Sequence, residues 1–421
     1  MCEMIAQKSR VVASFSLLFL ILITLPASVA AHGDPPEGLK IFAVDDGWVY
    51  VTNFGVITSD APHRYVCEEA FFASETYVVA PLEVERWATF SRGIAAFSDD
   101  GCDFEVRMPI VDAPTSVAVE RSGDEVAFAT RDDGQNELWH SSNGGQNFSE
   151  IAVELDDLYP TSIGFLDDRH LVVVGYLTDG DDRGQAIIVE IHVDSATRTE
   201  VEVDDGLVYP ELLDARGGDL LWHARRDGVT EVFWSHGEEL DTGHFESPGW
   251  PTSGALSPDG ELAYLGGVDG DGRGIFEARR SAPSNFEQVA ADHRALCMAV
   301  DGDSLLVCGH RRDDDHDLAR LHPDGTIEEI LDFRDLEGFR NDCDSDSRVE
   351  RTCPPVWPEL AQALGIEIDE DIDDDHEETD DGDESSCSFV DATTPGWIWL
   401  VAIVALLYKS RRAVSDRSQI L

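Results

Sequence analysis

The sequence predicts an all-β protein folded as a β-propeller, with seven blades as the simplest count and six or eight as alternatives. Two periodic patterns support this fold. A short glycine-containing turn sequence and a strand-like run rich in Val, Leu and aromatic residues both recur about every 44 residues. Propeller blades of four short strands have this repeat length. We therefore expect the propeller to span residues 32–334.

The clearest copy of the turn is Ser141-Ser-Asn143-Gly-Gly145-Gln-Asn-Phe148. We expect the Asn143 side chain to accept backbone amides, Gly145 to take a positive φ angle and Phe148 to pack beneath the turn. Two weaker copies supply the candidate turn residues Thr58, Asp60, Tyr65, Asp99, Gly101 and Phe104. Further decayed copies align from residues 192, 233, 279 and 321.

The strand-like runs keep the same period, and Gly and Asp turns bound most of them. They are Trp48–Thr52, Arg86–Phe90, Glu125–Thr130, His170–Tyr176, Asp219–Ala224, Glu261–Leu265 and Ser304–Cys308. Because each repeat contains one such run, the seven runs predict seven blades.

The turn pattern resembles the Asp-box, S/T-x-D/N-x-G-x-x-W/F, of sialidase-like (BNR-repeat) propellers. In that family the box is a structural turn on the face opposite the catalytic centre, so the resemblance implies architecture and no chemistry. Asp-boxes also occur in non-catalytic propellers. The Phe-Arg-Ile-Pro motif of sialidases is missing here, and no tyrosine has a recognisable catalytic setting. We therefore expect a non-catalytic binding module and no enzyme, with a sialidase-like glycoside hydrolase and a structural envelope protein as alternatives.

Residues 1–31 have the plan of a secretory signal peptide. A segment with basic residues precedes the apolar run Val11–Leu25, and small residues then lead to a cleavage point after Ala30 or Ala31. A retained N-terminal anchor is the alternative. The signal predicts export.

The C-terminal part continues the prediction of a surface protein. Region 366–386 holds 13 acidic residues and no Lys or Arg, so we expect a disordered linker. Region 387–421 then contains Cys387, the uncharged run Trp397–Tyr408 and a basic cluster. This order resembles the C-terminal sorting tag of secreted Myxococcus-type proteins. The resemblance implies capture at the cell surface with processing or lipid attachment at Cys387, and a single-pass transmembrane anchor is the alternative.

Six cysteines remain between the signal and Cys387, an even number that suits disulfides in an exported protein. The expected pairs are Cys297–Cys308, Cys343–Cys353 and Cys67–Cys102. The first pair lies symmetrically about a hairpin turn, the second closes a short loop in an extension at 335–365, and the third remains by elimination. The extension is also expected to hold a short helix near Pro358–Leu364.

The chain has 85 acidic and 30 basic residues and a formal net charge of −55. Nucleic acid and anionic membrane surfaces are therefore poor partners, and we expect a glycan or protein ligand at the cell surface. Acidic loops after the second strand of several blades share one face, and Asp-x-Asp loops suit Ca²⁺. The candidate ligands are Asp179, Asp181, Asp269, Asp271 and Asp313. Because no loop has the 12-residue ligand spacing, solvated turn residues are the favoured interpretation, and no other cofactor is expected.

Overall fold

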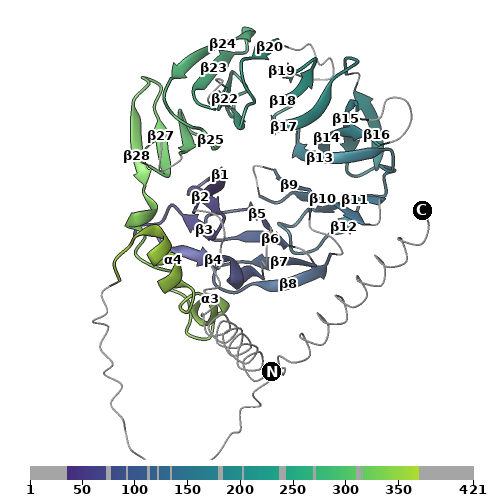
Figure 1. Ribbon diagram of the computed structural model, residues 1–421. Helices are drawn as coiled ribbons and strands as arrows, with labels where there is room; N and C mark the ends of the chain where they lie inside the picture. The colour runs from purple at the N-terminus through teal and green to yellow at the C-terminus, as the bar shows by residue number, and fades with distance from the viewer. Residues whose placement is uncertain are drawn as a thin grey trace, which may run out of the picture. The chain divides into compact units, whose positions relative to one another are not determined.

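Seven antiparallel four-stranded sheets follow one another along the chain, and each sheet uses four consecutive strands. The first strands of successive blades contact one another around a ring from blade 2 to blade 7, and the first strand of blade 7 contacts that of blade 1. Figure 1 shows this ring from one side, with the blades running from purple to green in chain order. The fold is a seven-bladed β-propeller, as the sequence predicts.

The structure is a computed structural model that describes residues 36–368 with gaps at 73–76, 92, 111–113, 121–122, 133–134, 179–183, 202, 237–242, 269–271, 310–313 and 315. The signal peptide, the acidic linker and the sorting segment with Cys387 lie outside the described residues.

The strands of blades 1 to 3 are β1 (Gly38–Val44), β2 (Gly47–Thr52), β3 (Gly55–Thr58), β4 (Tyr65–Cys67), β5 (Tyr77–Pro81), β6 (Trp87–Ser91), β7 (Ile94–Ser98), β8 (Glu105–Pro109), β9 (Ser116–Val119), β10 (Val126–Asp132), β11 (Gln135–Ser141) and β12 (Ser149–Glu150). Those of blades 4 and 5 are β13 (Leu158–Phe165), β14 (His170–Leu177), β15 (Ala186–His192), β16 (Thr197–Val201), β17 (Val208–Arg216), β18 (Asp219–Arg226), β19 (Val229–His236) and β20 (Gly243–Ser247). Blades 6 and 7 contain β21 (Ser253–Leu256), β22 (Leu262–Gly266), β23 (Ile275–Arg279), β24 (Ala282–Ala290), β25 (Cys297–Asp301), β26 (Ser304–Cys308), β27 (Leu318–Leu321) and β28 (Ile327–Leu331).

Each of the seven expected strand-like runs lies on the second strand of a blade. These strands are flanked by strands on both edges and by packed blades on both faces, so they read as short continuous apolar runs. The turn start points fall within one residue of the end of the third strand in six blades. The exception is residue 233, which lies inside β19 because that strand runs on to His236.

The ring closes without a strand shared between the two ends of the chain. Blade 1 packs directly on blade 7, because β1 contacts both β25 and β26. The Tyr50 hydroxyl, on β2, donates a hydrogen bond to the carbonyl of Asp317 at 2.9 Å. One hydrophobic cluster joins the two blades, with Ile41 and Val56 from blade 1 and Leu306 from blade 7.

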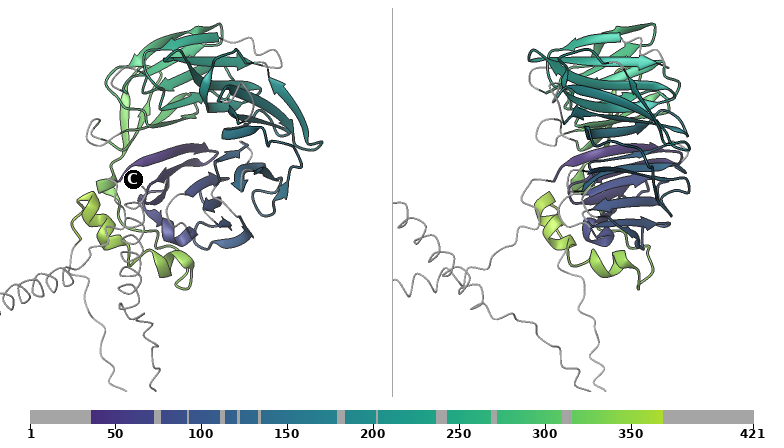
Figure 2. Two further views of the ribbon diagram at one scale, coloured as in Figure 1. Left: turned by 45° about the vertical axis from the view of Figure 1, so that its right-hand side comes forward. Right: turned by 90° about the vertical axis from the view of Figure 1, so that its right-hand side faces the viewer.

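The segment after β28 folds back along blades 1 and 2. It contains the 3-10 turn η2 (Phe333–Asp335) and the helices α3 (Arg348–Thr352) and α4 (Trp357–Leu364). Helix α3 contacts the 3-10 turn η1 (Glu68–Phe71), which follows β4 in blade 1. The helix expected near Pro358–Leu364 is confirmed as α4. Figure 2 shows α3 and α4 beside the first blades when the ring is seen edge-on.

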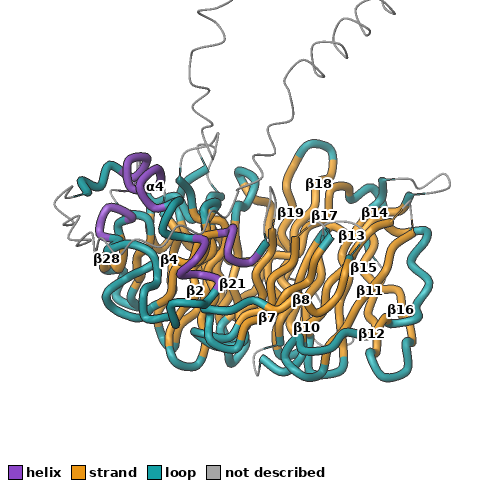
Figure 3. Tube along the Cα trace, turned by 90° about the horizontal axis from the view of Figure 1, so that it is seen from below, coloured by secondary structure: helices purple, strands orange, loops and turns teal. Residues whose placement is uncertain are grey.

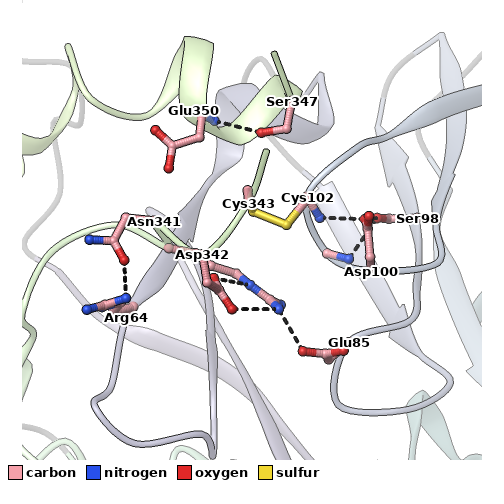
Figure 4. A network of polar contacts seen from close by, with 12 residues as sticks. Arg64, Glu85, Ser98, Asp100, Cys102, Asn341, Asp342, Cys343, Ser347 and Glu350 are labelled. Atoms are coloured by element: carbon pink, nitrogen blue, oxygen red, sulfur yellow. Dashed lines mark hydrogen bonds and ion pairs between the residues drawn. A yellow bond between two sulfur atoms is a disulfide. The ribbon is translucent and has the colours of Figure 1, made fainter. Parts of the chain in front are cut away.

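Backbone pairing and ion pairs fix this extension. Tyr65 forms a parallel bridge with Phe339, so the extension covers the outer edge of blade 1. Arg340 reaches Glu85 of blade 2 at 2.6 Å and also pairs with Asp342. Figure 4 shows this network around the Cys102–Cys343 disulfide.

Two of the three expected disulfide pairings are wrong. The structure confirms Cys297–Cys308, whose residues are register partners on β25 and β26. The other bonds are Cys67–Cys353 and Cys102–Cys343. The extension returns to blades 1 and 2, so each of its cysteines meets a propeller cysteine and not its neighbour in sequence.

Candidate functional site

One side of the ring, the upper face, carries the loops between second and third strands and the connections from each fourth strand to the next blade. First strands begin and second strands end there. The β18–β19 hairpin rises on this side in Figure 3. The candidate calcium ligands Asp179, Asp181, Asp269, Asp271 and Asp313 belong to these loops, and all five lie outside the described residues. In the described ranges, no group of three or more His, Cys, Asp or Glu side chains is placed to hold a metal ion.

Three consecutive blades enter their first strand through an aromatic residue followed by proline. The pairs are Tyr159-Pro160 in blade 4, Tyr209-Pro210 in blade 5 and Trp250-Pro251 just before β21 in blade 6. Proline has no amide hydrogen to donate to a sheet, so it is confined to strand starts, edges and bulges. Blades 4 and 5 both show a register shift at this step. A bulge of this kind turns the neighbouring side chain away from the regular pleat.

Tyr209 and Trp250 present their rings to solvent at this step. Tyr209 is 65% exposed and has a φ angle of 54°, in the left-handed region that residues with a Cβ atom rarely adopt. Trp250 is 38% exposed. An exposed ring on a strained backbone is costly, and such strain is concentrated at functional sites. These two rings are therefore the strongest sign of a binding surface on the described chain.

Two of the three aromatic–proline steps have an arginine from the preceding blade stacked over their aromatic ring. The guanidinium of Arg131 is 4.7 Å from the centre of the Tyr159 ring, and that of Arg225 is 5.6 Å from the Trp250 ring. Both arginines are the penultimate residue of a second strand, β10 and β18. Tyr176, the penultimate residue of β14, stacks on Tyr159 at 4.8 Å. We call Arg131, Tyr159, Tyr176, Tyr209, Arg225 and Trp250 the aromatic–arginine row.

A buried histidine lies beneath one end of the row. His223 is fully buried on β18, and its ring meets the Trp250 ring edge-on at 4.4 Å. Its Nε2 atom is 3.4 Å from a carboxylate oxygen of Glu211, whose side chain is 53% exposed. Within the described chain neither ring nitrogen makes a hydrogen bond. A buried polar group without a hydrogen bond is unfavourable, and this one lies directly beneath the Trp250 ring.

The backbone below the row is braced from blade to blade. The Thr161 hydroxyl donates to the Pro210 carbonyl at 2.7 Å, which ties the Tyr-Pro step of blade 4 to that of blade 5. The amide of Leu212 on β17 also donates to the Ser162 hydroxyl on β13, and the amide of Leu256 on β21 donates to the Asp214 carboxylate on β17. These bonds hold successive first strands at fixed positions, so the row is preorganised.

Lys40, the lysine of the propeller, faces the axis of the ring. It lies on β1, three blades away from Asp214 on β17, yet Asp214 acts on its charge. Loss of hydration lowers the pKa of Lys40, and the attraction of Asp214 partly offsets this. Arg216 is the single arginine on the first strands as described. The first strands, as far as the structure describes them, therefore supply no arginine cluster of the kind that a sialidase uses for a substrate carboxylate.

The opposite side, the lower face, carries the turns after the third strands. The hydroxyl of Ser141 accepts the amide of Gly145 at 2.9 Å, and the side chain of Asn143 accepts the amide of Asn147 at 3.0 Å. Phe148 packs against Phe128 with ring centres 5.1 Å apart. The polar side chains of this turn therefore bind its own backbone amides, and its aromatic residue packs in the core.

The other two candidate turns differ from this geometry. At the second, the carboxylate that accepts the backbone amides is Asp100 and not Asp99, with Gly101 bonded to Ser98 and Phe104 buried. At the third, Thr58 and Asp60 form no such bond in the described chain. Tyr65 there is a fully buried residue of β4.

A hollow lies on the lower face between blades 6 and 7. Its volume is about 240 Å³, and Tyr264, Glu277, His322 and Asp324 contribute to its lining. Burial, followed by the charge of Glu277, raises the pKa of Tyr264 to about 12. The hollow is small, and it lacks the outward-facing aromatic rings of the upper face.

The aromatic–arginine row is not among the sites predicted from the sequence, although the sequence carries a signal for it. An aromatic–proline step recurs once per blade in blades 4 to 6, ahead of the expected strand. Its exposure depends on the bulges, which periodicity does not reveal. Within residues 36–368 as described, no helix has the length and apolar character needed to cross a membrane.

No protein-family model and no curated protein matches the chain. Among solved structures, it is similar to hydrazine synthase of Kuenenia stuttgartiensis, with a TM-score of 0.51 and 11% identity over 72% of this chain and 99% of that chain. A putative TolB from Agrobacterium tumefaciens gives a TM-score of 0.41 and 14% identity over 54% and 84% of the two chains, and U3-55K gives 0.45 and 11% over 67% and 90%. At these identities the likeness concerns the fold alone. The chain is a seven-bladed β-propeller, while the Asp-box family and the sorting tag stay predictions.

Proposed function

We propose that this protein is an exported, surface-tethered recognition module that binds its ligand non-covalently on the upper face of the propeller. The observation that carries the proposal is the pair of exposed rings, Tyr209 and Trp250, held on a braced backbone. Aromatic residues and arginines dominate the binding energy of recognition surfaces, and a rigid frame lowers the entropy lost on binding. The row has both properties.

The sialidase-like alternative receives less support. A carboxylate-binding arginine cluster at the axis would favour it, and the described first strands contain Arg216 alone. The Asp-box-like turns lie on the lower face, away from the row. A purely structural role leaves the strained, exposed Tyr209 without a purpose.

The ligand surface is tested with the full chain on glycan and protein arrays. The double variant Tyr209→Ala/Trp250→Ala is expected to lose at least about tenfold in affinity for any ligand found. The matched control is Val106→Ala/Val289→Ala, which removes two exposed apolar side chains from the outer strands β8 and β24. A ligand that the double variant binds as well as the wild type would place recognition elsewhere. Release of sugar from an array glycan would favour the hydrolase.

Export and tethering rest on separate features of the chain. Three disulfides in the described part are typical of proteins that fold in an oxidising compartment. The predicted signal at 1–31 and the predicted tag at Cys387 give the address. Protease treatment of intact cells is expected to remove the propeller, and Cys387→Ser is expected to release it into the medium. A protease-protected propeller would contradict surface exposure.

A further inference from the structure

We propose that the aromatic–arginine row binds a glycan chain that carries widely spaced carboxylates. This inference rests on the proposed function and names its ligand class. The geometry points to such a ligand because the row combines exposed ring faces with two cationic groups, each placed at a boundary between blades.

Arg131 and Arg225 stand out among the cations of this chain. Acidic residues outnumber basic ones by 85 to 30, and other arginines such as Arg198 and Arg280 pair with carboxylates. Neither Arg131 nor Arg225 forms an ion pair with a described side chain. A guanidinium stacked on a ring keeps the N–H groups at its edge free, and that edge matches a carboxylate in a bidentate pair. Arg225 donates one N–H to the Gly228 carbonyl at 3.4 Å, and the remaining N–H groups of the two guanidiniums are available to a ligand.

The rings supply the second half of the chemistry. An aromatic face is electron-rich, and one face of a pyranose ring presents several C–H groups, so the two surfaces stack. The row runs over blades 4, 5 and 6, with one aromatic–proline step in each. Tyr209 and Trp250 offer exposed rings in blades 5 and 6. The half-buried Tyr159 of blade 4 instead stacks with Tyr176 and supports Arg131. A polymer can therefore meet a guanidinium over blade 4 and rings on the next two blades.

His223 and Glu211 add polar groups beside Trp250. The imidazole has no hydrogen bond in the described chain, and the Glu211 carboxylate is half exposed. Sugar hydroxyls both donate and accept, so they can bond the exposed Glu211 carboxylate, which lies 3.4 Å from the fully buried His223 imidazole. An acidic peptide offers this pair fewer hydroxyl partners.

The net charge of −55 limits how densely charged an anionic ligand can be and still bind. It repels nucleic acid, which carries a charge about every 1.7 Å. Repulsion between separated surface charges fades beyond about 10 Å at 0.1 M salt, whereas a stacked, hydrogen-bonded carboxylate keeps its contact with arginine. Carboxylates spaced along an otherwise neutral chain meet both conditions.

The test measures binding of the full chain by calorimetry in about 0.3 M NaCl, which screens the long-range repulsion. The probes are a hyaluronan octasaccharide, the same glycan with its carboxyl groups reduced, and poly-L-glutamate. The variants are Arg131→Gln, Arg225→Gln and Trp250→Ala. The control is Arg169→Gln, an exposed arginine in the β13–β14 turn on the lower face. Melting curves of all variants establish that they fold.

We expect the hyaluronan octasaccharide to bind, and each of the two Arg→Gln variants to weaken it about tenfold or more. The reduced glycan is expected to bind more weakly than its acidic form and to be insensitive to these substitutions. Trp250→Ala weakens both glycans, and Arg169→Gln weakens neither. Equal binding of acidic and reduced glycans would overturn the inference while leaving the proposed function intact.

Stronger binding of poly-L-glutamate than of the glycan would overturn the inference in favour of an acidic peptide. If none of the three probes binds, but an array ligand depends on Tyr209 and Trp250, the ligand class is wrong and the proposed function stands. If array ligands are also unaffected by Tyr209→Ala/Trp250→Ala, both fail.

Discussion

Cys67, the last residue of β4, is disulfide-bonded to Cys353, which lies 286 residues later in the chain. The bond joins the outer edge of blade 1 to the end of α3, and Cys102–Cys343 joins blade 2 to the same extension. Because every blade is built from consecutive strands, no shared strand crosses the seam between blades 1 and 7. The extension and its two disulfides tie the C-terminal side of the propeller to its first blades.

Removing the long-range disulfide is expected to destabilise the propeller more than removing the hairpin disulfide. Because Cys102–Cys343 stays closed in this comparison, the loop added by Cys67–Cys353 has about 45 residues, for which loop-closure entropy predicts about 4 kcal/mol, against about 3 kcal/mol for the 11-residue separation of Cys297–Cys308. The double variants Cys67→Ala/Cys353→Ala and Cys297→Ala/Cys308→Ala are compared by thermal melting. Equal melting temperatures would contradict a closing role. Non-reducing peptide mapping checks the pairing itself.

The disulfides illustrate what the sequence could and could not predict. Cys297–Cys308 follows from local register, because a symmetric hairpin places the two residues opposite each other. The other pairings depend on where the extension folds, and that is decided by contacts such as Tyr65 with Trp357 across a large sequence separation. The number of blades can be predicted for a similar reason, because each blade is a local unit of consecutive strands that leaves its own repeat in the sequence.

The candidate site was less predictable than the fold. Tyr209 reads in the sequence as one more apolar residue at the start of a strand. Its exposure arises from the bulge between Val208 and Glu211 and from the left-handed backbone. The partner of Trp250, Arg225, belongs to the preceding blade, and periodicity alone does not show which side chains of neighbouring blades meet.

Ser141→Ala is expected to destabilise the propeller by about 1–2 kcal/mol. The Ser141 hydroxyl is buried, accepts the amides of Asn143 and Gly145, and donates to the Asn143 side chain. Removing it leaves buried amides without an acceptor. Chemical denaturation measures the effect, with the exposed Ser149→Ala as the matched control. A change no larger than that of the control would mean that water replaces the hydroxyl.

Arg280→Ala is expected to destabilise the propeller by about 2–4 kcal/mol. The Asp219 carboxylate is almost fully buried where blade 5 meets blade 6, and Arg280 and His236 are its ion-pair partners. Without Arg280, a buried charge loses its permanent counter-charge. The adjacent Arg279→Ala is the control, because Arg279 is 71% exposed and its pair with Glu277 is worth about 0–1 kcal/mol. Similar losses for the two variants would contradict a specific role of the buried pair.

Glu68 is expected to make the propeller less stable as the pH rises from about 4.5 to about 7. Burial, and then the neighbouring charge of Glu69, raise the pKa of Glu68 from 4.5 to about 7. In that interval the folded chain keeps a proton on Glu68 that the unfolded chain has released, so raising the pH favours unfolding. Above pH 7 the penalty is complete, and after allowance for solvent screening it amounts to about 1–2 kcal/mol.

Glu68→Gln isolates this contribution from the general repulsion of a chain with 85 acidic residues. The amide cannot ionise, so the free energy of unfolding of the variant, minus that of the wild type, is expected to rise between about pH 5 and pH 7 and then level off. Denaturation series at several pH values measure the difference. Glu154→Gln, at an exposed position, controls for the removal of one negative charge and is expected to give a difference with little dependence on pH in this interval. A flat difference for Glu68→Gln would mean that the carboxyl ionises in the folded protein as it does in the unfolded chain, with η1 opening to water to admit the charge.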